Sequence, residues 1–266
     1  MSLSDDSSRL PSPLAARIDN ATLTYGGRLL FDGLDFALEE GLWTCLLGPT
    51  GVGKTSLLRL FAGLEKPDAG QARAGAVSYM AQQDLLMPWL TVIENTVIGS
   101  RLRAEPPDYE RARVLLASVG LADRSGDYPR SLSGGMRQRV ALARTLMEDR
   151  PLVLMDEPFS GLDAITRLRL QSLAVELLRG RTVLLVTHDP LEALRLGDRI
   201  HVMAGRPARI NKALTPAGDT PRDPADPALL AHQAELLARL TAAADADADA
   251  AATAAAAAAA ADGGPG

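Results

Sequence analysis

A glycine-rich segment lies between an apolar run and a helical pattern. Residues 48–55 read GPTGVGKT, after GLWTCLL at 41–47 and before the helical end of TSLLRLFAGL at 55–64. The spacing matches the P-loop in full, and in a P-loop the glycines let consecutive backbone N–H groups turn inward around phosphate. The sequence therefore predicts a strand, a phosphate-binding loop and a helix in this order.

Apolar strands and helices alternate along the central part of the chain. Three runs are typical of buried strands: AVSYMAQ at 76–82, PLVLMDE at 151–157 and RTVLLVTHD at 181–189. Buried strands that alternate with helices predict a mostly parallel sheet covered on both faces. The expected fold class is therefore α/β, with a P-loop NTPase core of mainly parallel sheet.

Two further parts of the chain differ from this pattern. Residues 16–25 and 29–41 resemble the strands of a hairpin with Gly26 and Gly27 as its turn, and they predict an antiparallel N-terminal β subdomain. Residues from about 84 to 148 have a mainly helical pattern. An inserted α-helical subdomain is therefore expected there.

The two ends of the chain have weaker patterns. Residues 1–15 are polar and proline-broken and predict a disordered lead, and 211–241 predict a proline-rich linker and a short helix capped by Asp226. Residues 242–266 predict a solvated, alanine-rich low-complexity tail; its alternating aspartates lack the glycine and distal glutamate of a calcium loop. The residues expected on one face of the short helix are Leu229, Gln233, Leu236, Leu237 and Leu240.

Charge and composition argue against several classes of protein. The net charge is -5 and the pI is near 5.3, whereas nucleic-acid binding usually needs a basic surface, so no nucleic-acid partner is expected. The single cysteine, Cys45, allows no intrachain disulfide, and no segment has about twenty strongly apolar residues. A soluble chain in a reducing, cytoplasmic compartment is predicted.

Charged and hydroxyl side chains at the P-loop and after a later strand indicate nucleotide chemistry. Lys54 would place a positive charge over the β- and γ-phosphates, and the Thr55 hydroxyl would ligate Mg²⁺. Asp156 would hold the Mg²⁺ shell, and Glu157 would polarise the attacking water as general base. ATP and Mg²⁺ are the expected cofactors. The predicted phosphate-binding residues are Gly48, Pro49, Thr50, Gly51, Val52, Gly53, Lys54, Thr55 and Ser56.

A second segment also has the form of an anion site. LSGGMRQRVALARTL, residues 132–146, supplies a hydroxyl at Ser133 and two glycines, Gly134 and Gly135, ahead of an amphipathic helix. The N-terminus of a helix offers N–H donors and a positive dipole end to an anion. The chain is therefore predicted to carry a second set of phosphate donors besides its P-loop.

The motifs follow one another in the order GPTGVGKT, Gln82, LSGGMRQ, LMDEP, SGLD and VTHD. In this order the chain resembles the nucleotide-binding subunits of ATP-binding cassette transporters, and the resemblance covers about residues 16–210, the expected ATPase domain. LSGG at the start of a helix shortly before LMDE is nearly exclusive to that family. Met136 replaces the glutamine often found after LSGG, on the helix flank and not among the phosphate-facing groups.

The resemblance implies roles for further residues. Tyr25 would stack on adenine, and Gln82, in preference to its neighbour Gln83, would approach Mg²⁺ and the attacking water. His188 would contact the γ-phosphate, and Asp163 in SGLD would lie in the loop that crosses to a second subunit. Without the motifs, Tyr25 would more often be a surface packing residue and His188 a buried, hydrogen-bonded one.

The resemblance also implies partners. In the family, the P-loop of one subunit and the Ser133 segment of a second copy hold one ATP in a homodimer, which closes on ATP binding and opens on hydrolysis. A transmembrane permease and a periplasmic or extracellular substrate-binding protein complete an importer, with the ATPase peripheral at the cytoplasmic face of the membrane. The apolar residues 87–90 would dock on the permease, and core packing of Trp89 is the alternative.

Other classes of cassette fit the sequence less well. Chromosome-maintenance cassettes carry long coiled coils between the P-loop and LSGG, and translation-associated cassettes usually carry two sets of motifs; this chain has neither feature. A cassette of an exporter or a lipid-transport system is the remaining alternative. The segment MPWLTVIENT looks most like importers of nitrate, sulfonates and taurine, and within that group the chain looks nearest the hydroxymethylpyrimidine branch, which serves thiamine precursors.

Overall fold

The computed structural model describes residues 13–262, so parts of the predicted lead and tail, 1–12 and 263–266, lie outside the described residues. An antiparallel sheet comes first, formed by β1 (Leu14–Tyr25), β2 (Arg28–Glu39) and β4 (Ala69–Ala74) in the order β2-β1-β4. The turn between β1 and β2 lies at Gly26 and Gly27, both with positive φ. The predicted antiparallel N-terminal subdomain is confirmed, and β4 adds a third strand to it.

The second sheet is built from six strands: β3 (Trp43–Leu47), β5 (Val77–Met80), β6 (Leu152–Asp156), β7 (Thr182–Val186), β8 (Arg199–Ala204) and β9 (Arg209–Ile210). Their order is β5-β6-β7-β3-β8-β9, and neighbouring strands are parallel except for β8 and β9. β3, β6 and β7 are buried along their whole lengths because both faces of the sheet are covered. The predicted mainly parallel core is confirmed.

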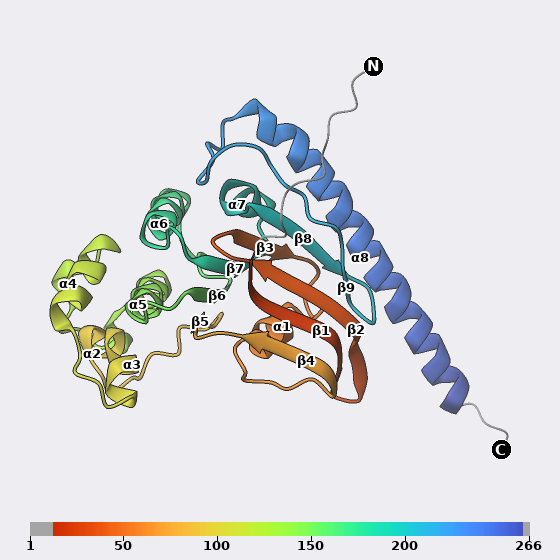
Figure 1. Ribbon diagram of the computed structural model, residues 1–266, viewed down its shortest axis with the longest axis horizontal. Helices are drawn as coiled ribbons and strands as arrows, with labels where there is room; N and C mark the ends of the chain where they lie inside the picture. Colours follow the sequence, from red (N-terminus) through yellow and green to blue (C-terminus); the bar gives the residue numbers. More distant parts are fainter. Residues whose placement is uncertain (1–12, 263–266) are drawn as a thin grey trace.

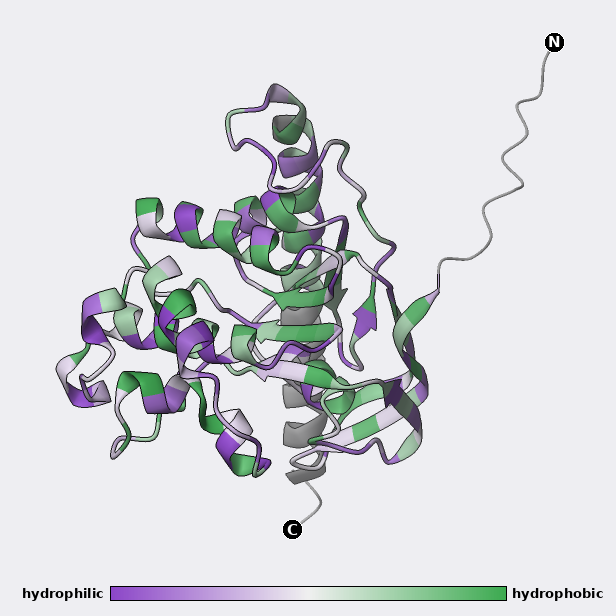
Figure 2. Cartoon of the chain, turned by 60° about the vertical axis from the view of Figure 1, so that its left-hand side comes forward, coloured by the Kyte–Doolittle hydropathy of each residue, from purple (hydrophilic) through white to green (hydrophobic). Residues whose placement is uncertain are grey.

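Alternate residues of β6 point into two separate hydrophobic cores. Leu152 and Leu154 pack with α1 on the side of the antiparallel sheet, whereas Val153 and Met155 pack with three other helices on the opposite side. Figure 1 shows this arrangement of layers, and Figure 2 shows hydrophobic residues along the central strands. The helices concerned are α1 (Lys54–Phe61), α5 (Gly134–Met147), α6 (Ala164–Leu177) and α7 (Pro190–Leu196).

The expected helical insertion forms a separate group beside the sheet, on the left in Figure 1. It contains α2 (Val92–Thr96), α3 (Ile98–Leu102), α4 (Tyr109–Ser118), two short 3₁₀ turns and the long helix α5. Val140 and Leu142 of α5 are buried in the core shared with the sheet. α5 therefore connects this helical group to the sheet.

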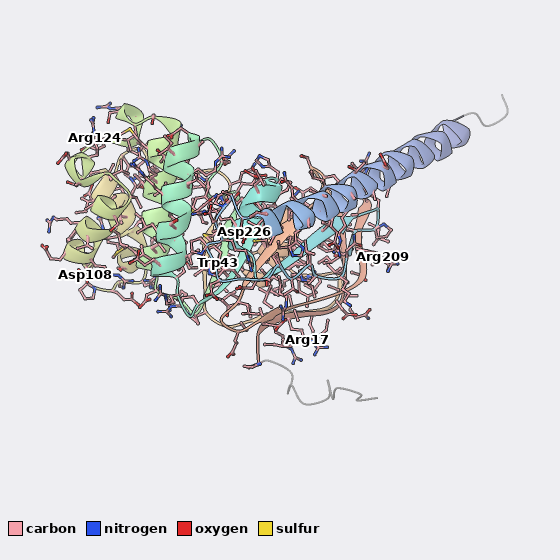
Figure 3. All side chains as sticks on the ribbon, turned by 90° about the horizontal axis from the view of Figure 1, so that it is seen from above. Arg17, Trp43, Asp108, Arg124, Arg209 and Asp226 are labelled. Atoms are coloured by element: carbon pink, nitrogen blue, oxygen red, sulfur yellow. The ribbon has the colours of Figure 1, made fainter. Side chains whose placement is uncertain are left out.

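The C-terminal helix is longer than the sequence analysis predicts. α8 runs from Pro227 to Asp262, after Asp226 caps its first turn by accepting from the Ala228 N–H at 2.9 Å. Figure 3 shows it as one unbroken rod that begins at Asp226. The helix predicted to be short therefore continues through the alanine-rich segment to Asp262, because alanine is the strongest helix former. No helix within residues 13–262 is long and apolar enough to span a bilayer.

The buried face of α8 also differs in part from the predicted one. Leu229, Leu236 and Ala243 are buried against α7 and β8, at a spacing of seven residues that keeps them on one side of the helix. Leu237 is 46% exposed, so its predicted place on the packed face is wrong. Leu240, by contrast, is partly buried against the same core, on the face that the sequence predicts.

Candidate functional site

The glycine-rich loop lies between β3 and α1, where the sequence predicts it. Gly48, Gly51 and Gly53 have positive φ, with 149° at Gly48 and 114° at Gly53. A Cβ atom on Gly48 would lie 2.3 Å from the Met203 carbonyl oxygen, and one on Gly53 would lie 2.9 Å from the Phe31 ring. The backbone angles and the close neighbours therefore both require glycine in this loop.

Lys54, the first residue of α1, turns back over the loop. Its ammonium group donates to the carbonyl oxygens of Gly48 at 2.7 Å and Pro49 at 2.8 Å. Burial lowers the pKa of Lys54, and the nearby carboxylates of Glu157 and Asp156 partly oppose this shift. A negatively charged ligand beside the ammonium would favour its charged form and raise this pKa again.

Asp156 ends β6 beside the start of α1. Its Oδ2 accepts a hydrogen bond from the Thr55 hydroxyl at 2.8 Å. Burial raises the pKa of Asp156, the Thr55 hydrogen bond and Lys54 lower it, and Glu157 raises it. A buried carboxylate and a hydroxyl in contact provide the oxygen ligands that Mg²⁺ prefers, so these residues fit the implied metal ion.

Glu157 follows Asp156 in a strained backbone conformation, with φ at 50°. Four hydrogen bonds fix its main chain. Its N–H donates to the Val186 carbonyl, and its own carbonyl accepts from the Ser160 N–H at 3.2 Å, the Ser160 hydroxyl at 2.9 Å and the Gln138 amide at 3.4 Å. The sequence analysis did not identify Gln138 and Ser160. Together these contacts fix the backbone position from which the Glu157 side chain extends at the end of the sheet.

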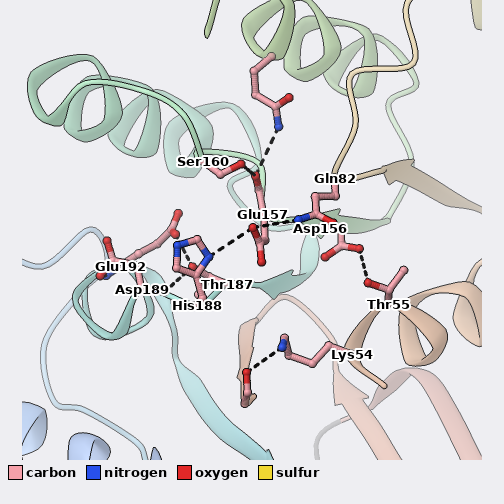
Figure 4. Close-up of polar contacts among 12 residues, drawn as sticks. Lys54, Thr55, Gln82, Asp156, Glu157, Ser160, Thr187, His188, Asp189 and Glu192 are labelled. Carbon is pink, nitrogen blue, oxygen red and sulfur yellow. Dashed lines mark hydrogen bonds and ion pairs between the residues drawn. The ribbon is translucent and has the colours of Figure 1, made fainter. Parts of the chain in front are cut away.

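Two predicted site residues meet the carboxylate of Glu157 (Figure 4). Gln82 Nε2 donates to Glu157 Oε2 at 3.3 Å, and His188 Nδ1 lies 3.3 Å from the same oxygen. Gln82 follows β5 and His188 follows β7, so three parallel strands bring these side chains to one edge. The convergence of strand ends at the ligand site is a general property of such sheets.

A cleft of about 330 Å³ joins the P-loop to these carboxylates. Tyr25 stands at its rim with 62% of its surface exposed. Leu30 and Arg59 also line the cleft, and the sequence analysis did not identify either residue. The predicted residues that line it are Tyr25, Thr50, Gly51, Gly53, Lys54, Thr55, Ser56, Gln82, Asp156 and Glu157.

The second predicted anion segment lies outside this cleft. Ser133 caps α5 by accepting from the Met136 N–H at 3.2 Å, and Ser133 and Gly134 are exposed. Neither they nor Gly135 belong to the described residues that line the cleft. Asp163 is also exposed and caps α6, with its Oδ1 accepting from the Thr166 N–H at 2.9 Å. The chain therefore presents the LSGG donors and Asp163 on its surface.

Comparison with known proteins gives concordant results. A family model described as "ABC transporter" matches residues 31–160. The chain is 47% identical to an aliphatic sulfonates import ATP-binding protein, SsuB 3, of Paraburkholderia xenovorans over 80% of this chain and 85% of that protein. It is 42% identical to an uncharacterised ABC transporter ATP-binding protein of Haemophilus influenzae over 84% of this chain and 98% of that one.

Among solved structures, the ATP-binding cassette MJ0796, in a dimer with ADP and phosphate, superposes with a TM-score of 0.70. The two are 26% identical, and the match covers 77% of this chain and all of that one. The chain belongs to the ATP-binding cassette transporter family. It is an ATPase coupled to transport, and the fold predicted from the sequence is that of this family.

One loop of the cassette is tied to the LSGG helix. Asp84 accepts from Arg137 at 2.9 Å, and Arg144 donates to the backbone carbonyls of Asp84 and Leu85. Farther along this loop, Trp89 is 70% exposed, so the alternative that Trp89 packs in the core is wrong. The indole of Trp89 is therefore accessible on an anchored loop.

A buried carboxyl group lies behind the loop that carries His188. Glu192 of α7 accepts from the Thr187 hydroxyl at 2.5 Å and from the Gln171 amide at 3.4 Å. The pKa of Glu192 is raised to about 7, mainly by burial and also by Asp189, against the lowering effects of the Thr187 and Gln171 hydrogen bonds and of Arg167. Glu192 therefore titrates near neutral pH in the folded cassette.

This titration predicts a pH-dependent stability. Between the ordinary value of 4.5 and about 7, the folded chain keeps a proton that the unfolded chain releases. The free energy of unfolding therefore falls as pH rises through this range. Relative to Glu192→Gln, which does not titrate, the wild type should lose roughly 1 kcal/mol between pH 6 and pH 8. Urea denaturation of both proteins measures this difference, with the exposed Glu176→Gln as control, and parallel pH curves would contradict it.

Proposed function

We propose that this cassette hydrolyses ATP to power import of a small organic sulfonate through a separate membrane permease. The observation that carries the proposal is the meeting of Gln82 and His188 on the Glu157 carboxylate, at the end of a cleft that begins with a P-loop. Such a cleft suits a nucleotide triphosphate, with phosphates on the loop and the attacked phosphorus near the carboxylate. Tyr25 at the rim would stack on the adenine ring.

The phosphates are held by the loop and its lysine. The backbone N–H groups of the loop, except at Pro49, which has none, and the positive end of α1 would face the β-phosphate. Lys54 would exchange its carbonyl partners for the β- and γ-phosphate oxygens. Thr55, Asp156 and Gln82 would hold Mg²⁺, directly or through water. When bound, this ion neutralises charge on the β- and γ-phosphates.

Glu157 is the general base in this mechanism. Its carboxylate takes the proton of the attacking water, and its fixed main chain keeps that carboxylate in line with the γ-phosphate. Gln82 orients the same carboxylate and the water. His188, which contacts Glu157 Oε2, supplies a donor to the γ-phosphate. These groups act by positioning and by charge, as in other phosphoryl transfers.

A second copy of the cassette would complete the site. Ser133, Gly134 and Gly135 are placed outside their own cleft, and they would donate to the γ-phosphate held by the partner's P-loop. Asp163 would lie in the loop that crosses to the partner. ATP then holds two subunits closed, and hydrolysis lets them open. The dimer formed by MJ0796 with ADP and phosphate supports this arrangement.

The relatives favour import of an aliphatic sulfonate. Proteins of Paraburkholderia xenovorans and Nocardia farcinica, 47% and 42% identical to this chain, are aliphatic sulfonates import ATP-binding proteins. An importer of this kind includes a substrate-binding protein outside the membrane and places the cassette on the permease at the cytoplasmic face. The hydroxymethylpyrimidine branch stays a prediction from the sequence, and the relatives named here support sulfonate over it.

Uptake in cells separates import from export. Cells that lack this chain should take up an aliphatic sulfonate such as hexanesulfonate at background rate, and re-expression should restore uptake because this subunit supplies the energy for it. The rate of entry of labelled sulfonate is the measurement, and labelled sulfate uptake in the same cells is the control. Undiminished sulfonate entry, or a raised cell content of sulfonate, would contradict import and favour the exporter alternative.

Docking on the permease is assigned to the loop around Trp89. The variant Trp89→Ala should lower the stimulation of ATPase activity by the permease about tenfold, since exposed aromatic residues carry much of the energy of an interface. Activity of the isolated cassette should stay unchanged. Val114→Ala, also at an exposed apolar residue but on α4, serves as control. An equal loss of stimulated and isolated activity would show that Trp89 does not act through docking.

A further inference from the structure

One guanidinium joins the two loops that carry Asp163 and His188. Arg167, in the first turn of α6, donates to the Leu162 carbonyl at 3.1 Å and to Asp189 Oδ2 at 3.2 Å. Leu162 directly precedes Asp163, and Asp189 directly follows His188. The two loops come from different parts of the chain, so this side chain is a cross-link between them.

The first loop is fixed at its attachment to α6. The Asp163 side chain caps α6 through the Thr166 N–H, and its carbonyl accepts from the Arg167 N–H at 2.9 Å. Gly161 and Leu162, just before it, lie beside Gly135 of the LSGG segment, where a Cβ would be 3.2 Å from Leu162 Cδ2. A displacement of this loop would therefore move the Leu162 carbonyl, to which the guanidinium is bonded.

The second loop is fixed around His188 in a similar way. Asp189 Oδ1 caps α7 by accepting from the Leu191 and Glu192 N–H groups, and the Asp189 N–H donates to the Thr187 hydroxyl at 3.0 Å. Figure 4 shows His188 between these residues and Glu157. The place of the His188 ring against the Glu157 carboxylate thus depends on where Asp189 is held.

We propose that Arg167 is a positioning residue for ATP hydrolysis. It holds His188 against Glu157, and it couples the position of His188 to that of the loop that contains Leu162 and Asp163. The proposal rests on the proposed roles of His188 and Glu157. The ion pair between Arg167 and Asp189 is partly exposed, so charge attraction contributes little to it. Arg167 acts mainly by donating to two acceptors at the same time. A planar guanidinium can address a carbonyl and a carboxylate together, whereas a lysine ammonium is a single point charge.

Three variants test the cross-link. Arg167→Gln removes it, Arg167→Lys keeps the charge alone, and Asp189→Asn loses the ion pair while asparagine still caps α7. We expect Arg167→Gln and Asp189→Asn to lower kcat by about 5- to 20-fold, with KM for ATP within about twofold, and Arg167→Lys to recover only part of this loss. Arg169→Gln, an exposed arginine on the same helix, should match the wild type.

Combination with His188→Ala identifies the path of the effect. If Arg167 acts through His188, the variant Arg167→Gln will not lower kcat further in a His188→Ala background. A normal kcat for Arg167→Gln, or the same loss of kcat with and without the His188 side chain, would overturn the role of Arg167 and leave the proposed function standing. A normal kcat for His188→Ala would instead overturn the proposed role of His188. If Arg167→Gln does not fold, Asp189→Asn in the same two backgrounds decides the question.

Discussion

Glu157→Gln will lower kcat for ATP hydrolysis by about 10²- to 10³-fold and leave ATP affinity nearly unchanged. The amide keeps the size of the side chain and an oxygen that can accept from Gln82, but it cannot take a proton from water. The residues proposed to hold the triphosphate, Lys54 and the P-loop, are unchanged in this variant. The loss therefore falls on the chemical step and not on binding.

Single-turnover kinetics measure the rate of the chemical step, and equilibrium binding measures the affinity for ATP. The matched control is Glu176→Gln, which makes the same change of charge on the exposed side of α6. The variant loaded with ATP should also persist as a dimer on gel filtration, because the anion proposed to hold both subunits is not removed. Hydrolysis near the wild-type rate would remove Glu157 from the role of base.

Local patterns predicted most of the elements around the site. The P-loop unit, the buried strands β6 and β7 and the hairpin turn follow from short stretches whose burial and turn residues are visible in the sequence. β4 could not be predicted in this way, because nearly all its side chains are exposed and it is held by pairing with β1. The full length of α8 was missed because an alanine run was interpreted as low complexity and not as a strong helix former.

Site residues that belong to a sequence motif could be predicted, whereas residues that act through packing and hydrogen bonds could not. Gln82, Glu157 and His188 belong to motifs, and their meeting follows once parallel strands are expected to end at one edge. Gln138 ends the LSGGMRQ motif, but nothing in the sequence links it to the Glu157 carbonyl, 19 residues away. Arg167 lies outside the motifs, and its hydrogen bonds to Leu162 and Asp189 are visible only in the structure. The sequence also did not decide whether Trp89 is buried or exposed, because an apolar residue on a loop is compatible with either.

The second large effect is a loss of bound nucleotide in heterodimers, and it is expected because the LSGG donors are exposed at the surface of the chain. Lys54→Ala removes the charge proposed to face the phosphates, and Gly135→Asp places a carboxylate where the γ-phosphate of the partner's ATP should lie. If one ATP is held by the P-loop of one copy and the LSGG segment of the other, the number of intact ATP sites depends on which chain of the dimer carries each substitution. Gly135→Ala is the matched control, since it adds the same Cβ beside Leu162 without the charge.

A heterodimer of Lys54→Ala with Gly135→Asp puts both lesions in one site, so it should retain about half of the wild-type nucleotide. A double-mutant chain paired with a wild-type chain has one lesion in each site and should retain almost none. Both heterodimers, purified through two different tags, are assayed for bound nucleotide and not for turnover, because cycling can require two sites. If LSGG served the P-loop of its own chain, the double-mutant pairing would keep the intact site instead, and that result would overturn the shared site.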